Sequence, residues 1–546
     1  MSNQQPALRP RGEWSSQLGF IFAALGSAVG LGNIWRFPGV AYENGGGAFL
    51  IPYVVALLTA GIPILFLDYA LGHRFRGSAP LALRRAAGGT GEALGWFQVM
   101  ISVFISLYYT AILAWTSMYF IYSINLTWES AETPTSFFLE NYLQVSDTPF
   151  TFDFVPHIVI PLIIFWILTL SILAMNVAAG LQRAAIIFLP MLVVSFLALV
   201  SGALTMPGAV EGLNTFFTPN FAALSNPSVW ISAYGQIFFS LSVAFGIMMT
   251  YSSYRRRRSN LTGSGLVVAF GNSAFEILSG IGVFAALGFF AAQQGTTIGE
   301  LEGLTGVGLA FMTFPAIVSA MPLSPIFGML FFGSLLLAGI TSLMSILEVV
   351  IGAVTDKFQV SRPVAVWGVG GVLATLSVML FGTTSGLLAL DTIDFFANNM
   401  GIVVSAVLTC ALAVWIARRG KELAEHLSVL STFKVGSTWL FLAGALSPVV
   451  IGIMLIRVIL TTVNDGYGDY PDWFILVTGW GTIAAMAVGA LILTAIPWRY
   501  NPALFDVWPP VAHQKPVAGA EQLAAARMDA ANNPGDTTMP PMPTTY

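Results

Sequence analysis

Residues 26–38 combine residue types that rarely occur together inside an apolar span. They read Gly-Ser-Ala-Val-Gly-Leu-Gly-Asn-Ile-Trp-Arg-Phe-Pro. Glycine weakens a helix, and backbone groups freed inside hydrocarbon must find other partners, so such a stretch must be buried in protein or line a cavity. Unpaired carbonyl and N–H groups around a cavity are suited to hold an ion or a zwitterion. We therefore interpret these residues as a break in a membrane helix that binds a charged ligand.

A second apolar span is interrupted in the same way. Residues 236–246 read Gln-Ile-Phe-Phe-Ser-Leu-Ser-Val-Ala-Phe-Gly, so serine, alanine and glycine stand near the middle of the span. The two breaks fall in the first and the sixth apolar spans of the chain. This arrangement is typical of two five-span halves of inverted topology, with the binding site between the unwound segments at the bilayer midplane.

The composition is that of a helical membrane protein. Of the 546 residues, 56% are hydrophobic and 9% are charged, whereas a soluble globular protein has about 25% charged residues. Several apolar runs exceed the roughly 18 residues that a membrane helix needs. No phosphate-binding loop, metal-ligand cluster or nucleophile triad indicates an enzyme. We expect the lipid bilayer as the surroundings and no nucleic-acid partner.

We count twelve hydrophobic spans, separated by polar segments. They lie at about residues 15–38, 45–71, 96–124, 157–175, 183–205, 229–252, 262–290, 326–355, 363–381, 386–417, 436–462 and 472–497. The domain organisation that we predict is a cytoplasmic N-terminal segment (1–13), two inverted-repeat halves (14–205 and 206–420), two further spans (421–499) and a disordered cytoplasmic tail (500–546).

The distribution of Lys and Arg predicts the orientation of these spans. The long segments 125–156, 206–228 and 291–325 contain no Lys or Arg, and they carry acidic residues instead. In the twelve-span arrangement nearly all basic residues share the side of the N-terminus, with Arg36 and Arg457 as the exceptions. Because cytoplasmic loops are enriched in Lys and Arg, we expect a multi-pass protein of the plasma (inner) membrane with both termini in the cytoplasm.

Several motifs in order along the chain resemble those of the neurotransmitter:sodium symporter family, in particular its bacterial amino-acid branch. They are Trp14-Ser-Ser-Gln-Leu-Gly19, the two broken segments, Glu43-Asn-Gly-Gly-Gly-Ala-Phe49, Tyr108-Tyr109, Asn272 with Glu276, Ala338-Gly-Ile-Thr341-Ser342 and Asp391 with Asp394. The resemblance implies an all-α membrane protein of twelve helices. It further implies a five-plus-five inverted repeat with helices 1 and 6 broken at the midplane, and two additional C-terminal helices.

The resemblance also implies two sodium sites. Sodium needs about five or six hard oxygen ligands. Site one is expected to use Ala28, Asn33, Ser240 and Asn272, completed by the substrate carboxylate, and site two to use Gly26, Val29, Ala338, Thr341 and Ser342. Two alternatives remain open from the residues alone. Thr341 and Ser342 could bond to carbonyls of their own helix, and the two asparagines could join helices to one another.

The substrate is expected between the two breaks. The resemblance assigns it the residues Ala28, Gly30, Leu31, Gly32, Ile105, Tyr109, Phe239, Ser240, Ser242, Phe245 and Ile346. Monoamine carriers of the family have an aspartate where Gly30 stands, so the substrate here should bring its own carboxylate. Ala244 stands where a bacterial relative has glycine, which should make the pocket smaller. Tyr109 could instead be an ordinary core aromatic.

Two gates are expected at the ends of the transport path. Arg36 should face Asp394 in the outer vestibule, and Arg11 should pair with Asp356 at the inner end, beside Trp14 and Tyr254. Arg11 could also be a solvated residue that only sets the orientation. Gly180 and Pro190 have the spacing found in relatives in which the start of the fifth helix unwinds to open the inner path.

Glu276 follows Asn272 by one helical turn, so both side chains point the same way. In eukaryotic relatives chloride binds near positions matching Tyr53, Gln236, Ser240 and Asn272, and a carboxylate at Glu276 can take its place. The alternative is a protonated, hydrogen-bonded glutamate. We therefore predict a sodium-coupled, chloride-independent symporter that imports a neutral amino acid by alternating access. The competing hypotheses are a carrier of another small zwitterion or osmolyte and a sodium-permeable channel.

Overall fold

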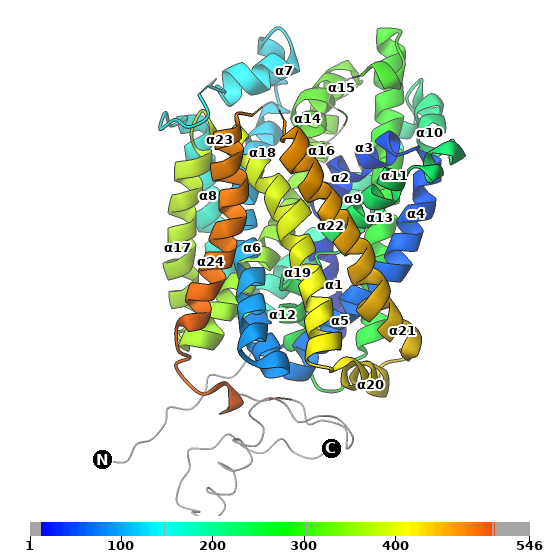
Figure 1. The fold of residues 1–546 in the computed structure, drawn as a ribbon. Helices are drawn as coiled ribbons and strands as arrows, with labels where there is room; N and C mark the ends of the chain where they lie inside the picture. The colour runs from blue at the N-terminus through cyan, green and yellow to red at the C-terminus, as the bar shows by residue number, and fades with distance from the viewer. Residues whose placement is uncertain are drawn as a thin grey trace, which may run out of the picture.

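The computed structural model describes residues 12–146, 148–301, 304, 306–468, 470–504 and 507. In these residues the chain is helical, with two isolated β-bridges between loops. Figure 1 shows the long helices running side by side in one bundle. The predicted tail (500–546) lies almost entirely outside the described residues, as does most of the segment 1–13.

Ten helices of the described chain are long and apolar enough to cross a membrane. They are Gly47–Phe75 (ending in α5, Ile62–Phe75), Ala79–Tyr122 (α6), Pro156–Leu173 (α8), Ala178–Leu204 (ending in α9, Arg183–Leu204), Leu261–Gln294 (α13), Ser324–Phe358 (α16), Arg362–Phe381 (α17), Gly386–Ile416 (with α18, Gly386–Phe396, and α19, Val403–Cys410), Ser437–Asp465 (ending in α22, Ser447–Asp465) and Asp472–Ala495 (ending in α24, Gly481–Ala495). Each corresponds to one of the predicted spans.

The first predicted span is broken where the glycine-rich stretch predicts it. Helix α1 (Gln17–Ala28) ends, and after Val29 and Gly30 the chain restarts as α2 (Leu31–Trp35) and α3 (Phe37–Glu43). The two parts are bent by 54°. Val29 has ψ 90° and Gly30 is extended, so neither continues the helix. The last carbonyls of α1 and the first N–H groups of α2 therefore lack helical partners.

The sixth predicted span is broken as well. Helix α11 (Pro227–Ser240) and α12 (Ile247–Ser253) are separated by residues 241–246, in which Ser242, Ala244 and Gly246 have φ values of 53°, 65° and 91°. A left-handed conformation costs a non-glycine residue about 1–2 kcal/mol, so surrounding contacts must hold this turn. The ten long helices and the two broken spans together correspond to the twelve predicted spans.

The polar segments between spans contain helices that the sequence analysis did not predict. Helix α10 (Ala209–Phe217) packs on α13, and α15 (Phe314–Ala320) follows the short α14 (Gly306–Gly308). Helix α20 (Gly420–Leu430) packs against α5 at the opposite end of the bundle. These helices cap the two ends of the molecule (Figure 1).

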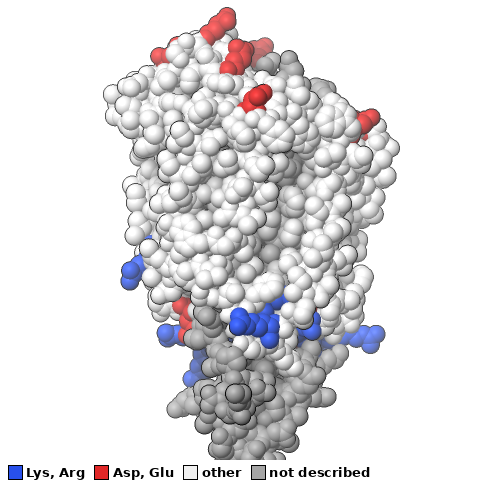
Figure 2. All heavy atoms as spheres, turned by 90° about the vertical axis from the view of Figure 1, so that its left-hand side faces the viewer, with Lys and Arg blue, Asp and Glu red and all other residues white. Residues whose placement is uncertain are grey.

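Charged side chains separate along the length of the bundle. On the face shown in Figure 2, Lys and Arg gather toward one end, most Asp and Glu lie at the other, and an uncharged belt lies between. A belt without charges suits the hydrocarbon region of a bilayer. The two ends are called the basic end and the acidic end below.

A buried ion pair holds the basic end together. Lys357 at the end of α16 donates to Glu92 of α6 at 2.8 Å, and both side chains are fully buried. The indole N–H of Trp498, which follows α24, donates to the same carboxylate at 2.8 Å. These three residues tie the ends of α6, α16 and α24 to one another. Removing one partner of the buried pair would leave an uncompensated charge.

Candidate functional site

A cavity of about 490 Å³ lies between the two breaks and extends toward the acidic end. Residues of both broken spans line it together with residues of α6, α16 and α18. The lining includes Ser27, Ala28, Gly30, Leu31, Gly32, Asn33, Arg36, Ile105, Tyr109, Phe239, Ser240, Ser242, Phe245, Ser342, Ile346, Asp391, Asp394 and Tyr467. All eleven predicted substrate residues are therefore on the cavity wall.

The side chains expected at sodium site one meet at one point. Asn33 of α2 donates to Asn272 of α13 at 2.9 Å, and Asn272 donates to Ser240 at the end of α11. The side-chain oxygen of Asn33 accepts the N–H of Gly30 at 2.9 Å, which closes the first turn of α2. Ala28 lines the cavity at the end of α1, where its carbonyl has no helical donor. The set is rich in hard oxygens and contains no carboxylate of its own.

The residues expected at sodium site two also lie together. A Cβ added to Gly26 would lie 3.4 Å from the Cβ of Thr341, so α1 and α16 are in contact there. Ser342 donates to the carbonyl of Ser27 at 3.1 Å, and Thr341 donates to the carbonyl of Ala338 at 2.9 Å. Val29, whose carbonyl completes the predicted set, is the first residue after α1.

Thr341 therefore shows the back-bonding that the sequence left open, whereas Ser342 reaches across to the other helix. The Ser342 hydroxyl thus lies beside the Ser27 carbonyl of α1, and the Thr341 hydroxyl lies beside the Ala338 carbonyl of its own helix. An oxygen-rich set of this kind suits a hard cation such as sodium, so the donor chemistry at both positions fits the ion.

The start of α2 is suited to a carboxylate. The hydroxyl of Tyr109 lies 3.4 Å from the backbone nitrogen of Leu31. A Cβ on Gly30 would lie 2.9 Å from the hydroxyl of Ser342 and 3.2 Å from that of Tyr109. The absence of a side chain at Gly30 thus leaves space surrounded by N–H and O–H groups at the positive end of a helix.

The walls of the cavity are apolar on the side of α6 and α16. Ile105, Phe245 and Ile346 lie there, each about 5% exposed. A Cβ on Gly32 would lie 2.1 Å from the ring of Phe239, so that ring packs directly against the backbone of α2. Ala244 is fully buried behind the turn and is not part of the described lining. The sequence analysis expected Ala244 to make the pocket smaller. Because Ala244 does not line the cavity, it does not restrict the size of the substrate by direct contact, and that prediction is wrong.

The unwound turn is held by contacts on both sides. Ser242 donates to the carbonyl of Ser27 at 3.1 Å, which joins the two breaks to one another. Ser102 of α6 donates to the carbonyl of Phe245 at 3.1 Å, and Ser405 of α19 donates to that of Ala244 at 2.5 Å. These contacts offset the strain of the left-handed residues.

Glu276 is buried beside site one. Its carboxylate accepts hydrogen bonds from the hydroxyl of Tyr53 and, at 2.6 Å, from the amide of Gln236. The side chain is fully buried, and it lies within hydrogen-bond reach of Ser240. Tyr53, Gln236 and Ser240, three of the four residues that the sequence analysis expected at this position, thus contact the carboxyl group.

At the acidic end, the expected gate is open. Arg36 lies over the ring of Phe239, 4.6 Å from its centroid. Asp394 accepts from Asn398 at 2.7 Å. Both charged residues line the cavity, and the ion pairs of the described chain do not include one between them. The cavity lining also includes the exposed Glu43, so the cavity reaches the surface at this end.

At the basic end, the path is closed. Trp14 donates its indole N–H to the carbonyl of Tyr251 at 2.8 Å and its backbone N–H to that of Tyr254 at 3.1 Å. Asp356 accepts from the backbone of Ser78 at 2.8 Å. Arg11, its predicted partner, lies outside the described residues. The conformation is open toward the acidic end and closed toward the basic end.

Comparison with known proteins identifies the family. Residues 11–135 and 125–500 match the sodium:neurotransmitter symporter family. The chain belongs to the sodium:neurotransmitter symporter family. It is therefore a multi-pass membrane protein and a sodium-dependent symporter, not an enzyme, as the sequence predicts.

Individual members of this family extend the comparison. An uncharacterised sodium-dependent transporter of Methanocaldococcus jannaschii is 40% identical over 468 residues, which cover 85% of this chain and 94% of the relative. The sodium- and chloride-dependent GABA transporter 2 of Homo sapiens is 29% identical, over 85% of this chain and 83% of the relative. A crystal structure of MhsT in complex with L-phenylalanine matches with a TM-score of 0.70 and 31% identity, over 82% of this chain and 99% of MhsT.

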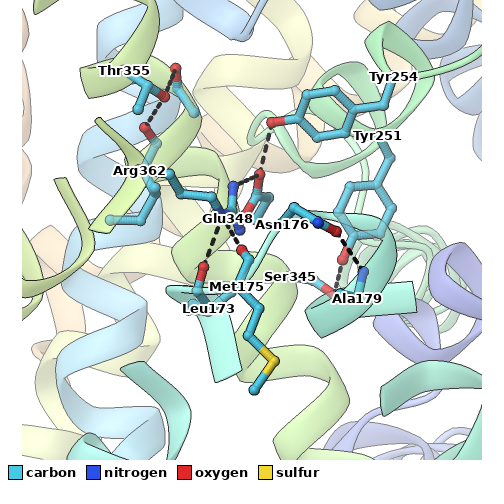
Figure 3. A network of polar contacts seen from close by, with 12 residues as sticks. Leu173, Met175, Asn176, Ala179, Tyr251, Tyr254, Ser345, Glu348, Thr355 and Arg362 are labelled. Atoms are coloured by element: carbon cyan, nitrogen blue, oxygen red, sulfur yellow. Dashed lines mark hydrogen bonds and ion pairs between the residues drawn. The ribbon is translucent and has the colours of Figure 1, made fainter. Parts of the chain in front are cut away.

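In this symporter the basic end also contains a network that the sequence analysis missed (Figure 3). Arg362, at the start of α17, binds both carboxylate oxygens of Glu348 in α16, at 2.9 and 2.5 Å. Its Nε donates to the carbonyls of Leu173 and Met175 at 2.7 and 2.6 Å. The hydroxyl of Tyr254 donates to Glu348 at 2.7 Å. The Arg362–Glu348 pair thus joins α16, the residue that ends α12 and the connection that follows α8.

A signal for this network was present. Glu348 is an ionisable residue inside an apolar span, and such a residue indicates a functional site by default. Arg362 gave no comparable signal, because a basic residue at a span end also satisfies the orientation rule. The same connection leads to Ala178–Gln182, the helical turn that begins the fifth span and contains Gly180. In this structure that turn is not unwound.

Proposed function

We propose that this symporter imports a neutral amino acid together with sodium, by alternating access and without chloride. The observation that carries the proposal is the space at Gly30. It is lined by the Tyr109 and Ser342 hydroxyls and by the first N–H groups of α2. Hydrogen-bond donors at a helix N-terminus favour an anionic group, and the side chains nearest to this space are the two neutral hydroxyls of Ser342 and Tyr109.

The opposite side of the cavity is suited to an ammonium group. Helix α11 ends at Ser240, so the carbonyls of its last residues lack helical donors. Phe239, Ser240 and Ser242 all line the cavity at this point. An α-amino acid placed between the breaks would direct its carboxylate to α2 and its ammonium to the end of α11. Its side chain would then face Ile105, Phe245 and Ile346.

Coupling to sodium follows from the position of site one. Asn33 belongs to the same short helix that presents N–H groups to the carboxylate. A carboxylate bound there would lie next to the ion and supply one of its oxygen ligands. Each ligand would then raise the affinity of the other, since coupling of binding free energies is reciprocal. A second ion at Gly26, Val29, Ala338, Thr341 and Ser342 would hold α1 against α16.

The relatives agree with an amino-acid substrate. MhsT was crystallised with L-phenylalanine, and vertebrate relatives are described as carriers of GABA, glycine and taurine. All of these ligands carry both an amino and an acidic group. The same observation keeps other small zwitterions, including osmolytes, as the second candidate class.

The chloride proposal depends on Glu276. The mammalian relatives are described as chloride-dependent. In this chain a carboxyl group already occupies the position among Tyr53, Gln236 and Ser240. A fixed negative charge there would balance the sodium ions near the midplane. With the basic end in the cytoplasm, the open path would face outward and transport would be inward.

Competition for uptake tests the substrate class. Purified protein in proteoliposomes with an inward sodium gradient is given one labelled neutral amino acid, and unlabelled amino acids and their decarboxylated amines compete. We expect competition by neutral α-amino acids and none by the amines. Equal competition by the amines would contradict the role of Gly30 and Tyr109. Sodium-driven uptake of a labelled betaine, with no uptake of labelled neutral amino acids, would favour the osmolyte class.

Anion replacement tests the role of Glu276. Wild-type uptake should be unchanged when gluconate replaces chloride. Glu276→Ser should lose transport in gluconate and regain part of it in chloride. Glu132→Ser, at an exposed carboxylate of the acidic end, is the matched control and should behave as wild type. A wild type that needs chloride, or a Glu276→Ser variant that ignores it, would contradict the proposal.

A further inference from the structure

Asp68 of α5 lies directly behind the unwound turn between α11 and α12. Its Oδ2 accepts the backbone N–H of Ala244 at 2.9 Å. Ala244 is one of the left-handed residues, with φ 65°. The neighbouring Ser242 and Phe245 face the cavity. The carboxyl group of Asp68 therefore helps to fix the conformation of the segment that lines the substrate cavity.

The surroundings of Asp68 provide no positive charge. The side chain is fully buried, and it belongs to none of the ion pairs in the described part of the chain. Its second oxygen, Oδ1, has no hydrogen-bond donor among the described residues. The charge of Asp68 acts on two titratable groups, Tyr69 on the same helix and Cys410 on α19, and neither is a cation. Arg255, which follows α12, acts on Tyr69 and is not among the groups that act on Asp68.

The other helices around this position contribute neutral groups. From α12, the hydroxyl of Ser252 reaches the backbone carbonyl of Asp68 at 3.5 Å and not its carboxyl group. From α6, Gln98 donates to Thr409 of α19 at 3.0 Å, while its own side-chain oxygen also has no donor among the described residues. Two acceptor oxygens without donors thus lie in the region between α5, α6 and α19.

An ionised carboxylate in this environment would be a buried anion with one hydrogen bond and no cation. Such a charge is far more costly to bury than the neutral acid. A proton on Oδ1 removes the charge and leaves Oδ2 free to accept from Ala244. We propose that Asp68 is a proton-binding residue that holds the unwound turn as a neutral acid in the outward-open conformation.

This proton site is distinct from Glu276. In the part of the chain that the structure describes, the hydrogen bonds of Asp68 involve no residue expected to bind sodium or substrate. The proton at Asp68 therefore positions the turn without competing for the sodium ligands. Ionisation of Asp68 at alkaline pH would place an uncompensated charge beside Ala244 and disturb the turn. Transport is then expected to fall at alkaline pH for a reason independent of sodium ligation.

Infrared spectroscopy tests protonation without any transport assay, so its result does not depend on the substrate. Asp68→Asn preserves the shape and the acceptor oxygen of the neutral acid. In sodium buffer without amino acid, wild type should show a carbonyl band of a protonated carboxyl group that Asp68→Asn lacks. Glu276→Gln should retain this band, and Glu132→Gln should leave the spectrum unchanged. If wild type and Asp68→Asn show the same absorption in the region of protonated carboxyl groups, Asp68 is ionised and the proposal is overturned.

Uptake as a function of pH tests the positioning role. Asp68→Asn should retain at least half of wild-type uptake at neutral pH and should keep it at alkaline pH, where wild-type uptake falls. Asp68→Ala, which cannot accept from Ala244, should reduce the maximal uptake rate at least tenfold. An inactive Asp68→Asn with normal sodium binding would show that the anion is required. That result, or parallel pH profiles for wild type and Asp68→Asn, would overturn the proposal.

Discussion

The hydroxyl of Tyr109 lies 3.2 Å from the point where Gly30 would carry a Cβ, so the tyrosine and the glycine define one small polar space. The same hydroxyl is 3.4 Å from the backbone nitrogen of Leu31. The N-terminus of α2 and the Tyr109 hydroxyl of α6 meet there, and Gly30 leaves room between them because it has no side chain. This relationship leads to the first prediction.

Tyr109→Phe should weaken substrate binding and leave the fold intact. A hydrogen bond to a charged group contributes about 1.5–3 kcal/mol, so the apparent affinity should fall roughly 10-fold to 100-fold. Equilibrium binding of a labelled amino acid in saturating sodium measures the change. Tyr122→Phe, near the far end of α6, is the control. Unchanged affinity in Tyr109→Phe would show that this residue is an ordinary core aromatic.

Arg36→Ala should impair transport more than sodium binding. Arg36 lies over Phe239 and apart from Asp394 in this open conformation, so the variant removes a group needed for closure and not an ion ligand. Sodium titration of binding and of uptake on the same preparation separates the two effects. Arg457→Ala, at an exposed position of α22, is the control. Loss of sodium affinity in Arg36→Ala would place Arg36 at the ion site itself.

Arg362→Ala should destabilise the protein strongly. Glu348 is fully buried and Arg362 is 19% exposed, and removal of one partner of such a pair costs on the order of 3 kcal/mol. The double variant Arg362→Ala with Glu348→Ala should be more stable than Arg362→Ala, because it leaves no unpaired buried charge. Thermal unfolding in detergent compares them, with the exposed Arg258→Ala as control. A double variant less stable than either single variant would contradict this interpretation.

The pH dependence of stability should depend on His426. Burial, with the nearby His73 and Arg74, lowers the pKa of His426 well below its usual range. His73 uses Nε2 toward the carbonyl of Arg256, so its Nδ1 accepts from His426 at 2.8 Å. Below about pH 6.5 an unfolded histidine binds a proton that the folded one does not, so stability is present above that pH and is lost as the pH falls.

The variant His426→Gln should show less of this loss, because its amide can still donate to His73 and does not titrate. Between pH 7.5 and 5.5 the wild type should lose roughly 1 kcal/mol more than the variant. Melting temperatures at the two pH values test this. Equal losses in both proteins would show that His426 is not responsible.

The sequence predicted the spans and both breaks because hydrophobic length and glycine placement are local signals. Residues 26–38 and 236–246 contain in their own composition the reason why a helix stops there. Eight of the eleven predicted substrate residues stand in these two segments, whereas Ile105, Tyr109 and Ile346 reach the cavity from α6 and α16 and were predicted from the family resemblance.

The remaining parts depend on contacts between distant segments, which the sequence does not display. Ala244 stands between the cavity-lining residues Ser242 and Phe245, yet it is fully buried and is not part of the cavity lining. Arg362 binds the carbonyls of Leu173 and Met175 about 190 residues earlier, and carbonyls have no sequence signature. Asp68 was visible as a charge inside an apolar span, but its partner is a backbone N–H that is free only because the turn is unwound.

Accumulation against a gradient tests the central claim most directly. Proteoliposomes containing the purified protein and an equal internal and external concentration of a neutral amino acid are given an inward sodium gradient. The account predicts net accumulation inside that grows with the gradient and with a negative internal potential, since one charge moving through 100 mV gains about 2.3 kcal/mol. Accumulation driven fully by a proton gradient without sodium would contradict it, as would sodium flux unaffected by the presence of the amino acid.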